Sequence, residues 1–114
     1  MHRDIHPDNI LCSSDGTNLK LIDFGVSRKF SSEKNDQEFE NKIITVTGLF
    51  SYRAPEMMEG KEYSEKVDVW SAGVVLYECF SGTNPFMTKY KKDTGKNIIN
   101  LPIKELITDE LEAE

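Results

Sequence analysis

The fold is decided by a stretch near the start of the chain, His2-Arg3-Asp4-Ile5-His6-Pro7-Asp8-Asn9, and by the two apolar runs that come after it. These runs, at residues 10–12 and 19–22, are of strand type and flank the dipeptide Asp15-Gly16, and Asp-Gly between two apolar runs is a strong β-hairpin signal. If Asp15-Gly16 forms a two-residue turn, Asn9 lies opposite Ile22. The open end of the hairpin then brings Asn9 and Asp23 together.

Three oxygen-bearing side chains are expected at that open end. Asn9 and Asp23 come from the two strands, and Asp4 enters the same space from the preceding loop. Carboxylate and amide oxygens that crowd together in this way suit a hard cation such as Mg²⁺ together with a phosphate group. The sequence therefore predicts a magnesium and phosphate site beside the hairpin.

The motifs that carry chemistry occur in a fixed order: His2-Arg3-Asp4 with Asn9, then Asp23-Phe24-Gly25, then Ala54-Pro55-Glu56. This ordered set resembles the catalytic loop, the metal-binding triplet and the end of the activation segment in serine/threonine protein kinases. The run at residues 68–74 is similar to the central helix of that family. A single Asp-Phe-Gly would be weak support, but the ordered set is specific, and the resemblance covers at least residues 2–86.

The resemblance implies an α+β fold: a protein-kinase-like C-terminal lobe, mainly helical with a small β-hairpin and truncated at both ends. We expect residues 1–114 to form a partial protein kinase domain without the N-lobe and the last helices. The family's Gly-rich loop and strand lysine, which hold the phosphates of ATP, do not precede Met1. We therefore expect the fragment alone to be inactive, whereas its parent would transfer the γ-phosphoryl group of ATP to protein hydroxyls.

The resemblance also assigns roles to individual residues. Asp4 would be the catalytic base, although an isolated aspartate in a loop would more simply be a capping residue. Asn9 and Asp23 would hold Mg²⁺, and Asn9 also counts among the catalytic groups. Leu11 would lie under the adenine ring, which is compatible with an ordinary core position. The cofactors that the resemblance implies are ATP and Mg²⁺.

Other residues would support this site. By the same resemblance, His2 would pack on Phe24, and Asp68 would bind backbone N–H groups of the catalytic loop. Glu56 would pair with an arginine that lies beyond residue 114, because the arginines present are better placed elsewhere. These roles are structural rather than chemical.

One predicted regulatory site lies in the activation segment. Thr45 stands three residues before Gly48, at the place of the family's main activating phosphosite, and the alternative is a threonine in a strand. Arg3 and Arg28 are the cations that would receive its phosphate. An upstream activating kinase would then be a partner of this protein.

Two positions depart from the family pattern. His6 stands where lysine usually steadies the transferred phosphate, and Leu49 stands where threonine is usual. Histidine is shorter than lysine and only partly charged near neutral pH, so phosphoryl transfer should weaken. These changes favour an alternative function, a non-catalytic pseudokinase-like interaction module. The intact Asp4, Asn9 and Asp23 oppose it.

Composition limits the remaining possibilities. Lys and Arg number 14 against 20 Asp and Glu, for a net charge of −6, and no basic stripe is present to indicate a nucleic-acid partner. The longest apolar run, residues 73–77, is too short to span a bilayer, and the N-terminus has no signal-peptide pattern. We expect a soluble cytoplasmic protein that binds ATP and a protein substrate. Cys12 and Cys79 lie in apolar runs and are predicted to be buried free thiols.

A long helix is predicted after Ser64, which can cap its N-terminus, and Gly82 should end it. Because apolar residues occupy nearly all faces of this segment, we expect the helix to be buried all round. A short amphipathic helix with a solvated acidic face is predicted from Pro102 onwards.

Overall fold

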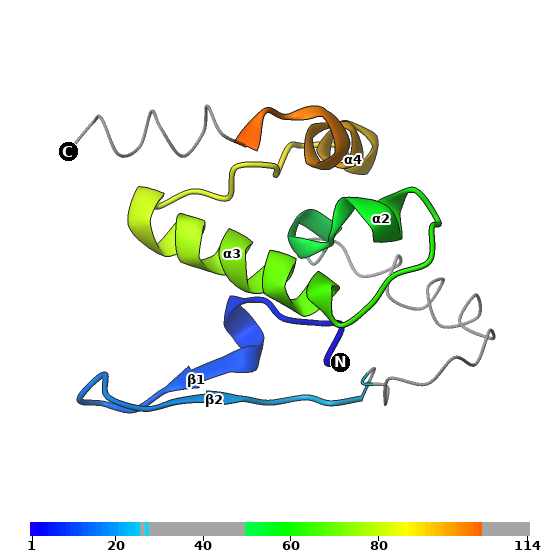
Figure 1. Ribbon diagram of the computed structural model, residues 1–114. Helices are drawn as coiled ribbons and strands as arrows, with labels where there is room; N and C mark the ends of the chain where they lie inside the picture. Colours follow the sequence, from blue (N-terminus) through cyan, green and yellow to red (C-terminus); the bar gives the residue numbers. More distant parts are fainter. Residues whose placement is uncertain (26, 28–49, 104–114) are drawn as a thin grey trace.

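Figure 1 shows the computed structural model of the chain, which describes residues 1–25, 27 and 50–103. The described part is mainly helical with one small β-hairpin, as the expected fold class requires. Some of the sequence predictions fall outside the described residues: those for Arg28, Thr45 and Leu49, and most of the helix from Pro102 onwards.

The hairpin has the register that the sequence predicts. Strand β1 (Ile10–Cys12) pairs antiparallel with strand β2 (Leu19–Leu21), and a short 3₁₀ turn, Pro7–Asn9, leads into it. The backbone N–H of Ile22 donates to the carbonyl oxygen of Asn9 at 2.9 Å. Asn9 and Ile22 therefore face each other at the open end of the hairpin.

The chain reversal is wider than a two-residue turn. The backbone N–H of Ser13 donates to the carbonyl oxygen of Asn18 at 2.9 Å, so residues 14–17 make the reversal. The carboxylate of Asp15 accepts hydrogen bonds from the hydroxyl groups of Ser13 at 2.6 Å and Thr17 at 2.8 Å. These bonds close the wider turn and leave the predicted register unchanged.

The helices follow the hairpin in sequence: a 3₁₀ turn at Phe50–Tyr52, then α2 (Pro55–Met58), α3 (Lys66–Ser81) and α4 (Lys91–Asn100). The hydroxyl group of Ser64 accepts a hydrogen bond from the backbone N–H of Lys66 at 3.3 Å, but the N-cap of α3 is Glu65, whose side chain makes no capping bond. Gly82 ends α3 with a φ of 83°, a left-handed conformation that glycine adopts without steric cost. The predicted end of this helix is confirmed, and the helix begins one residue later than one capped by Ser64 would.

The core lies on one side of α3. One buried cluster contains Tyr52, Val74, Phe86 and Ile98, and a second contains Ala54, Met57 and Val67. Trp70 packs against both clusters, and its ring stacks on Phe86 with centroids 5.7 Å apart. In Figure 1, α2 and α4 lie on one side of α3 and the hairpin lies on the other.

The prediction that α3 is buried all round is wrong for the described structure. Val69, Leu76 and Phe80 share one face of the helix and are 64%, 58% and 76% exposed. Their positions repeat at helical spacing on the side opposite to the buried Val67 and Val74. An apolar composition therefore marks this face as one that could be buried, but no described element covers it.

The prediction of buried cysteines is also wrong. Cys12 and Cys79 are both free and both exposed. Cys12 belongs to a strand whose outer residues are largely open to solvent, and Cys79 lies beside the exposed Phe80 on α3. Among the described residues, no helix is both long enough and apolar enough to cross a membrane.

Candidate active site

The loop at residues 2–9 is held against the first turn of α3 by a single carboxylate. Asp68 accepts a hydrogen bond from the backbone N–H of His2 at 2.7 Å through Oδ2, and another from that of Arg3 at 2.8 Å through Oδ1. Arg3 has a φ of 70°, which is uncommon for a residue other than glycine. Asp68 thus makes the contact expected of it and stabilises a strained backbone in loop 2–9.

Asn9 connects loop 2–9 to the hairpin. Its side-chain Nδ2 donates to the carbonyl oxygen of Asp4 at 2.8 Å and approaches the Oδ2 atom of Asp4 at 3.3 Å. Asn9 is only 6% exposed, and its own carbonyl oxygen accepts from Ile22. Because these bonds use the amide nitrogen, the side-chain oxygen of Asn9 is left as the acceptor that a cation could approach.

His2 joins the same loop to the segment after β2. Its Nδ1 accepts from the backbone N–H of Asp4 at 3.1 Å, and its Nε2 lies 2.9 Å from the carbonyl oxygen of Ile22. These two partners assign the neutral tautomer with the proton on Nε2. The His2 ring meets the Phe24 ring edge-on at 4.8 Å, so the expected contact between them is present.

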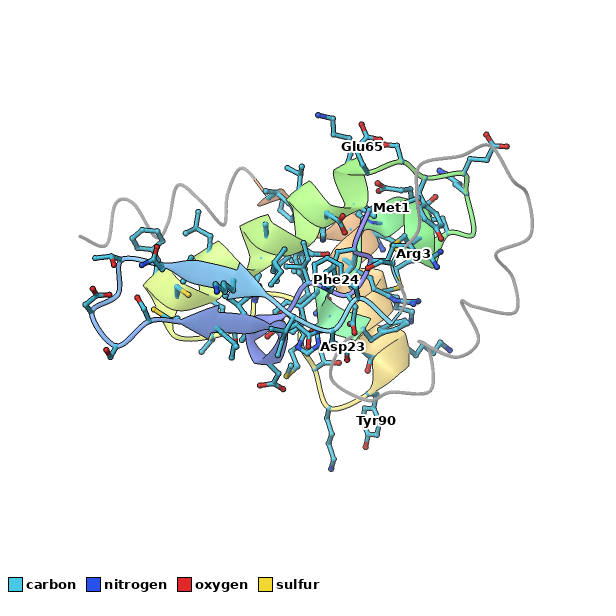
Figure 2. The ribbon with its side chains drawn as sticks, turned by 90° about the horizontal axis from the view of Figure 1, so that it is seen from below. Met1, Arg3, Asp23, Phe24, Glu65 and Tyr90 are labelled. Carbon is cyan, nitrogen blue, oxygen red and sulfur yellow. The ribbon has the colours of Figure 1, made fainter. Side chains whose placement is uncertain are left out.

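Asp23 ends the hairpin in an unusual backbone conformation. Its φ is 58°, and its Oδ1 accepts from the backbone N–H of Gly25 at 3.2 Å. A Cβ atom at Gly25 would lie 3.1 Å from that oxygen, so glycine permits the close approach. Figure 2 shows Asp23 and Phe24 beside loop 2–9, which carries Arg3, and the Asp23 side chain is exposed.

The surroundings of Asp4 make its carboxyl group less acidic than that of an exposed aspartate. Burial raises the pKa of Asp4 above its usual value, and the nearby charge of Asp23 acts in the same direction. His6 and the hydrogen bond from Asn9 oppose this shift without cancelling it. The Nε2 atom of His6 lies 3.5 Å from Oδ1 of Asp4. Because its pKa is raised, Asp4 is a stronger proton acceptor than an ordinary surface carboxylate.

A comparison with known protein families agrees with this geometry. The family model described as "Protein kinase domain" matches residues 1–113. The chain belongs to the protein kinase family. Loop 2–9, the hairpin and helices α2 to α4 all lie within the matched residues.

Several curated kinases are similar to this kinase chain over most of its length. An aurora kinase from Debaryomyces hansenii is 40% identical over 104 residues, which are 91% of this chain and 24% of that protein. An aurora kinase from Schizosaccharomyces pombe is 48% identical over 75% of this chain and 22% of that protein. The serine/threonine-protein kinase ste20 from Aspergillus fumigatus is 45% identical over 78% of this chain and 10% of that protein. The chain spans about a quarter of the length of the aurora kinases that it matches.

Three further kinase residues named from the sequence lie in different surroundings. Leu11 is 53% exposed, so an ordinary core position is wrong and its side chain is accessible to a ligand. Glu56 is half-buried and has no ion-pair partner within the described ranges. Arg3 is only 5% exposed, and its Nη1 donates to the hydroxyl oxygen of Tyr63 at 2.8 Å.

The donor set fits a magnesium ion shared with a nucleotide better than a metal held by the protein alone. Among the described residues, no group of three or more His, Cys, Asp and Glu side chains lies close enough to hold a metal ion. Asn9 and Asp23 offer one amide oxygen and one exposed carboxylate. Mg²⁺ commonly takes one or two protein oxygens together with phosphate oxygens and water, so these two residues fit that ion.

Two residues that make specific side-chain hydrogen bonds belong to none of the motifs found in the sequence. Tyr63 bonds Arg3, and Glu78 accepts from the hydroxyl group of Tyr52 at 2.5 Å through Oε2. Burial, helped by that bond, raises the pKa of Tyr52 to about 12, so the phenol stays protonated near neutral pH. Glu78 interrupts the apolar run of α3, which is the one sequence signal that could have indicated its role.

Proposed function

We propose that the protein containing this chain is a serine/threonine kinase that transfers the γ-phosphoryl group of ATP to protein hydroxyls. The observation that carries the proposal is the arrangement around Asn9, whose side-chain nitrogen bonds Asp4 and whose backbone carbonyl accepts from Ile22, the residue before Asp23. The relatives that bear serine/threonine kinase names support it. Residues 1–114 would supply part of the C-terminal lobe and would be inactive alone.

The residues of loop 2–9 and of the hairpin would have different roles in phosphoryl transfer. Asp4 would accept the proton of the substrate hydroxyl, and its raised pKa suits that role. Asn9 and Asp23 would hold Mg²⁺, which when bound neutralises charge that develops on the phosphoryl oxygens. Leu11, exposed on β1, would contact the adenine ring.

Arg3 would act in regulation rather than in the transfer itself. With Arg28, it would receive the phosphate that an upstream kinase places on Thr45. Arg3 is itself a buried residue of loop 2–9, so a phosphate bound to it would stabilise the loop that carries Asp4.

A second candidate function is a non-catalytic interaction module, and the observation that favours it is the position of His6. The His6 side chain is 6% exposed and turned towards Asp4, so it is not free to reach a phosphate as a lysine would. A site of this kind binds nucleotide or partners without efficient transfer. Intact Asp4, Asn9 and Asp23 make the catalytic proposal the stronger one.

We further propose an intracellular location. Cys12 and Cys79 are free and exposed, and free thiols persist in the reducing compartments of the cell. The partners would be ATP and a protein substrate, with no role for nucleic acid or a membrane.

The test uses an aurora hybrid, in which residues 1–114 replace the matching part of an aurora kinase catalytic domain. With Mg²⁺ and labelled ATP, the aurora hybrid should phosphorylate a serine peptide in preference to a tyrosine peptide. Asp4→Asn should lower the rate about 10²- to 10⁴-fold, the usual contribution of a general base. Asp8→Asn, at an exposed position nearby, is the matched control. Binding of Mg-ATP without any transfer would favour the interaction module.

A further inference from the structure

The backbone and the side chain of Arg3 are both hydrogen-bonded to one short stretch of the chain. Asp68 binds its backbone N–H at 2.8 Å, and the hydroxyl oxygen of Tyr63 accepts from its Nη1 at 2.8 Å. Both partners belong to residues 63–68, which lead into α3. Tyr63, which none of the quoted kinase motifs includes, thus holds one nitrogen of the Arg3 guanidinium.

The position of the Tyr63 hydroxyl is set by packing and not by Arg3 alone. The Tyr63 ring packs against the buried cluster of Ala54, Met57 and Val67. A tyrosine ring in such a cluster has few conformations, so its hydroxyl group is a rigid acceptor. Ala54 and Met57 belong to the segment around α2, and Tyr63 thus connects that segment to Arg3.

We propose that Tyr63 is a positioning residue for Arg3 and holds its guanidinium in the orientation in which it binds a phosphate monoester dianion. Arginine has a long side chain that loses rotamer entropy when it is ordered, so an arginine ordered in advance binds phosphate more tightly. The guanidinium has several N–H donors, and a bond through Nη1 fixes its plane while the fork geometry still matches phosphate oxygens. The inference rests on the proposed role of Arg3 but not on phosphoryl transfer.

The first experiment titrates the 114-residue chain with phenyl phosphate and follows the Arg3 Nε–H resonance by NMR. Tyr63→Phe keeps the ring and removes only the acceptor, and it should weaken phosphate binding at least fivefold. Arg3→Lys should weaken it at least as much. Tyr90→Phe is the matched control, because Tyr90 is 61% exposed and points away from the molecule in Figure 2. Its affinity should equal that of the unchanged chain.

The second experiment supplies the phosphate from within the chain, as phosphothreonine at position 45. Its second pKa, about 6 in a free phosphopeptide, should be lower in the chain if Arg3 binds the dianion, and ³¹P NMR measures it. Tyr63→Phe should raise this phosphate pKa again, by at least half of the amount by which the chain lowers it. If Tyr63→Phe weakens only the binding of phenyl phosphate, Arg3 binds phosphate esters from outside the chain. If Tyr63→Phe also changes the pKa of the phosphothreonine at position 45, Arg3 binds the phosphate carried by the chain itself.

A purely structural role for Tyr63 gives a different pattern. The melting temperature of Tyr63→Phe would then fall while both phosphate measurements stay unchanged, and that result overturns the proposal. Tyr63→Leu, which also fills the apolar site, provides a second variant if the phenylalanine variant does not fold. Phosphate binding by the unchanged chain that does not move the Arg3 resonance also overturns it. Neither experiment contains ATP, so an inactive aurora hybrid would refute kinase activity without bearing on Tyr63.

Discussion

Removing the carboxylate of Asp68 should release loop 2–9 from α3. Two backbone N–H groups, those of His2 and Arg3, donate to its two oxygens at 2.7 and 2.8 Å. A hydrogen bond to a charged group contributes about 1.5–3 kcal/mol. Both bonds are only partly buried, so water can bind the two N–H groups once the carboxylate is gone. The lower end of this range of free energies therefore applies to each bond. We expect Asp68→Ala to lower the free energy of unfolding by about 3 kcal/mol, and Asp68→Asn, which keeps one acceptor oxygen, by about 1.5 kcal/mol.

Urea unfolding followed by far-ultraviolet circular dichroism measures these free energies, and hydrogen exchange of the His2 and Arg3 amides measures the local effect. Glu62→Gln removes an exposed charge from the same region and should change the unfolding free energy by less than about 0.5 kcal/mol. If Asp68→Ala is as stable as the unchanged chain and both amides stay protected, the account of how α3 holds loop 2–9 is refuted.

Three further predictions concern the core, the catalytic loop and the hairpin turn. The indole N–H of Trp70 has no hydrogen-bond partner within the described structure, so Trp70→Phe should cost far less unfolding free energy in urea than Trp70→Ala, which should cost about 3–5 kcal/mol. His6→Lys combined with Leu49→Thr should raise the turnover of the aurora hybrid by more than the product of the single effects, and strictly multiplicative effects would contradict a shared polar cluster. The pKa of Asp15 is lowered to about 2 by hydrogen bonds from the hydroxyl of Ser13 and from residue 17. The turn is therefore stabilised above the ordinary aspartate pKa of about 4 and loses that stabilisation as the pH falls through about 2. Asp15→Asn should remove this pH dependence of the turn's amide resonances.

The hairpin was predictable because its signals are local. Apolar runs on either side of Asp15-Gly16 define which residues pair, and Asn9 does face Ile22. The width of the turn was not predictable from that pattern, because it depends on the hydrogen bonds that the Asp15 carboxylate accepts. Both turn geometries give the same register.

The contacts of Asp68 and His2 were predictable only through the family resemblance, since they join residues far apart in the sequence. The bond between Tyr63 and Arg3 has no motif and depends on side-chain orientation, which sequence spacing does not determine. The exposed face of α3 could not be foreseen for another reason. Hydrophobic composition tells which faces of a helix favour burial, but the arrangement of the other elements decides which faces are covered.

The central claim is that Asp4 performs chemistry while Asn9 and Asp23 hold the metal with the nucleotide. A single-turnover measurement on the aurora hybrid, with Mg-ATP affinity measured on the same samples, tests it most directly. The account predicts that Asp4→Asn leaves Mg-ATP affinity unchanged and slows transfer at least about 100-fold. It predicts that Asp23→Asn weakens Mg-ATP binding itself. Transfer at an unchanged rate in Asp4→Asn, with Mg-ATP bound, would contradict the account.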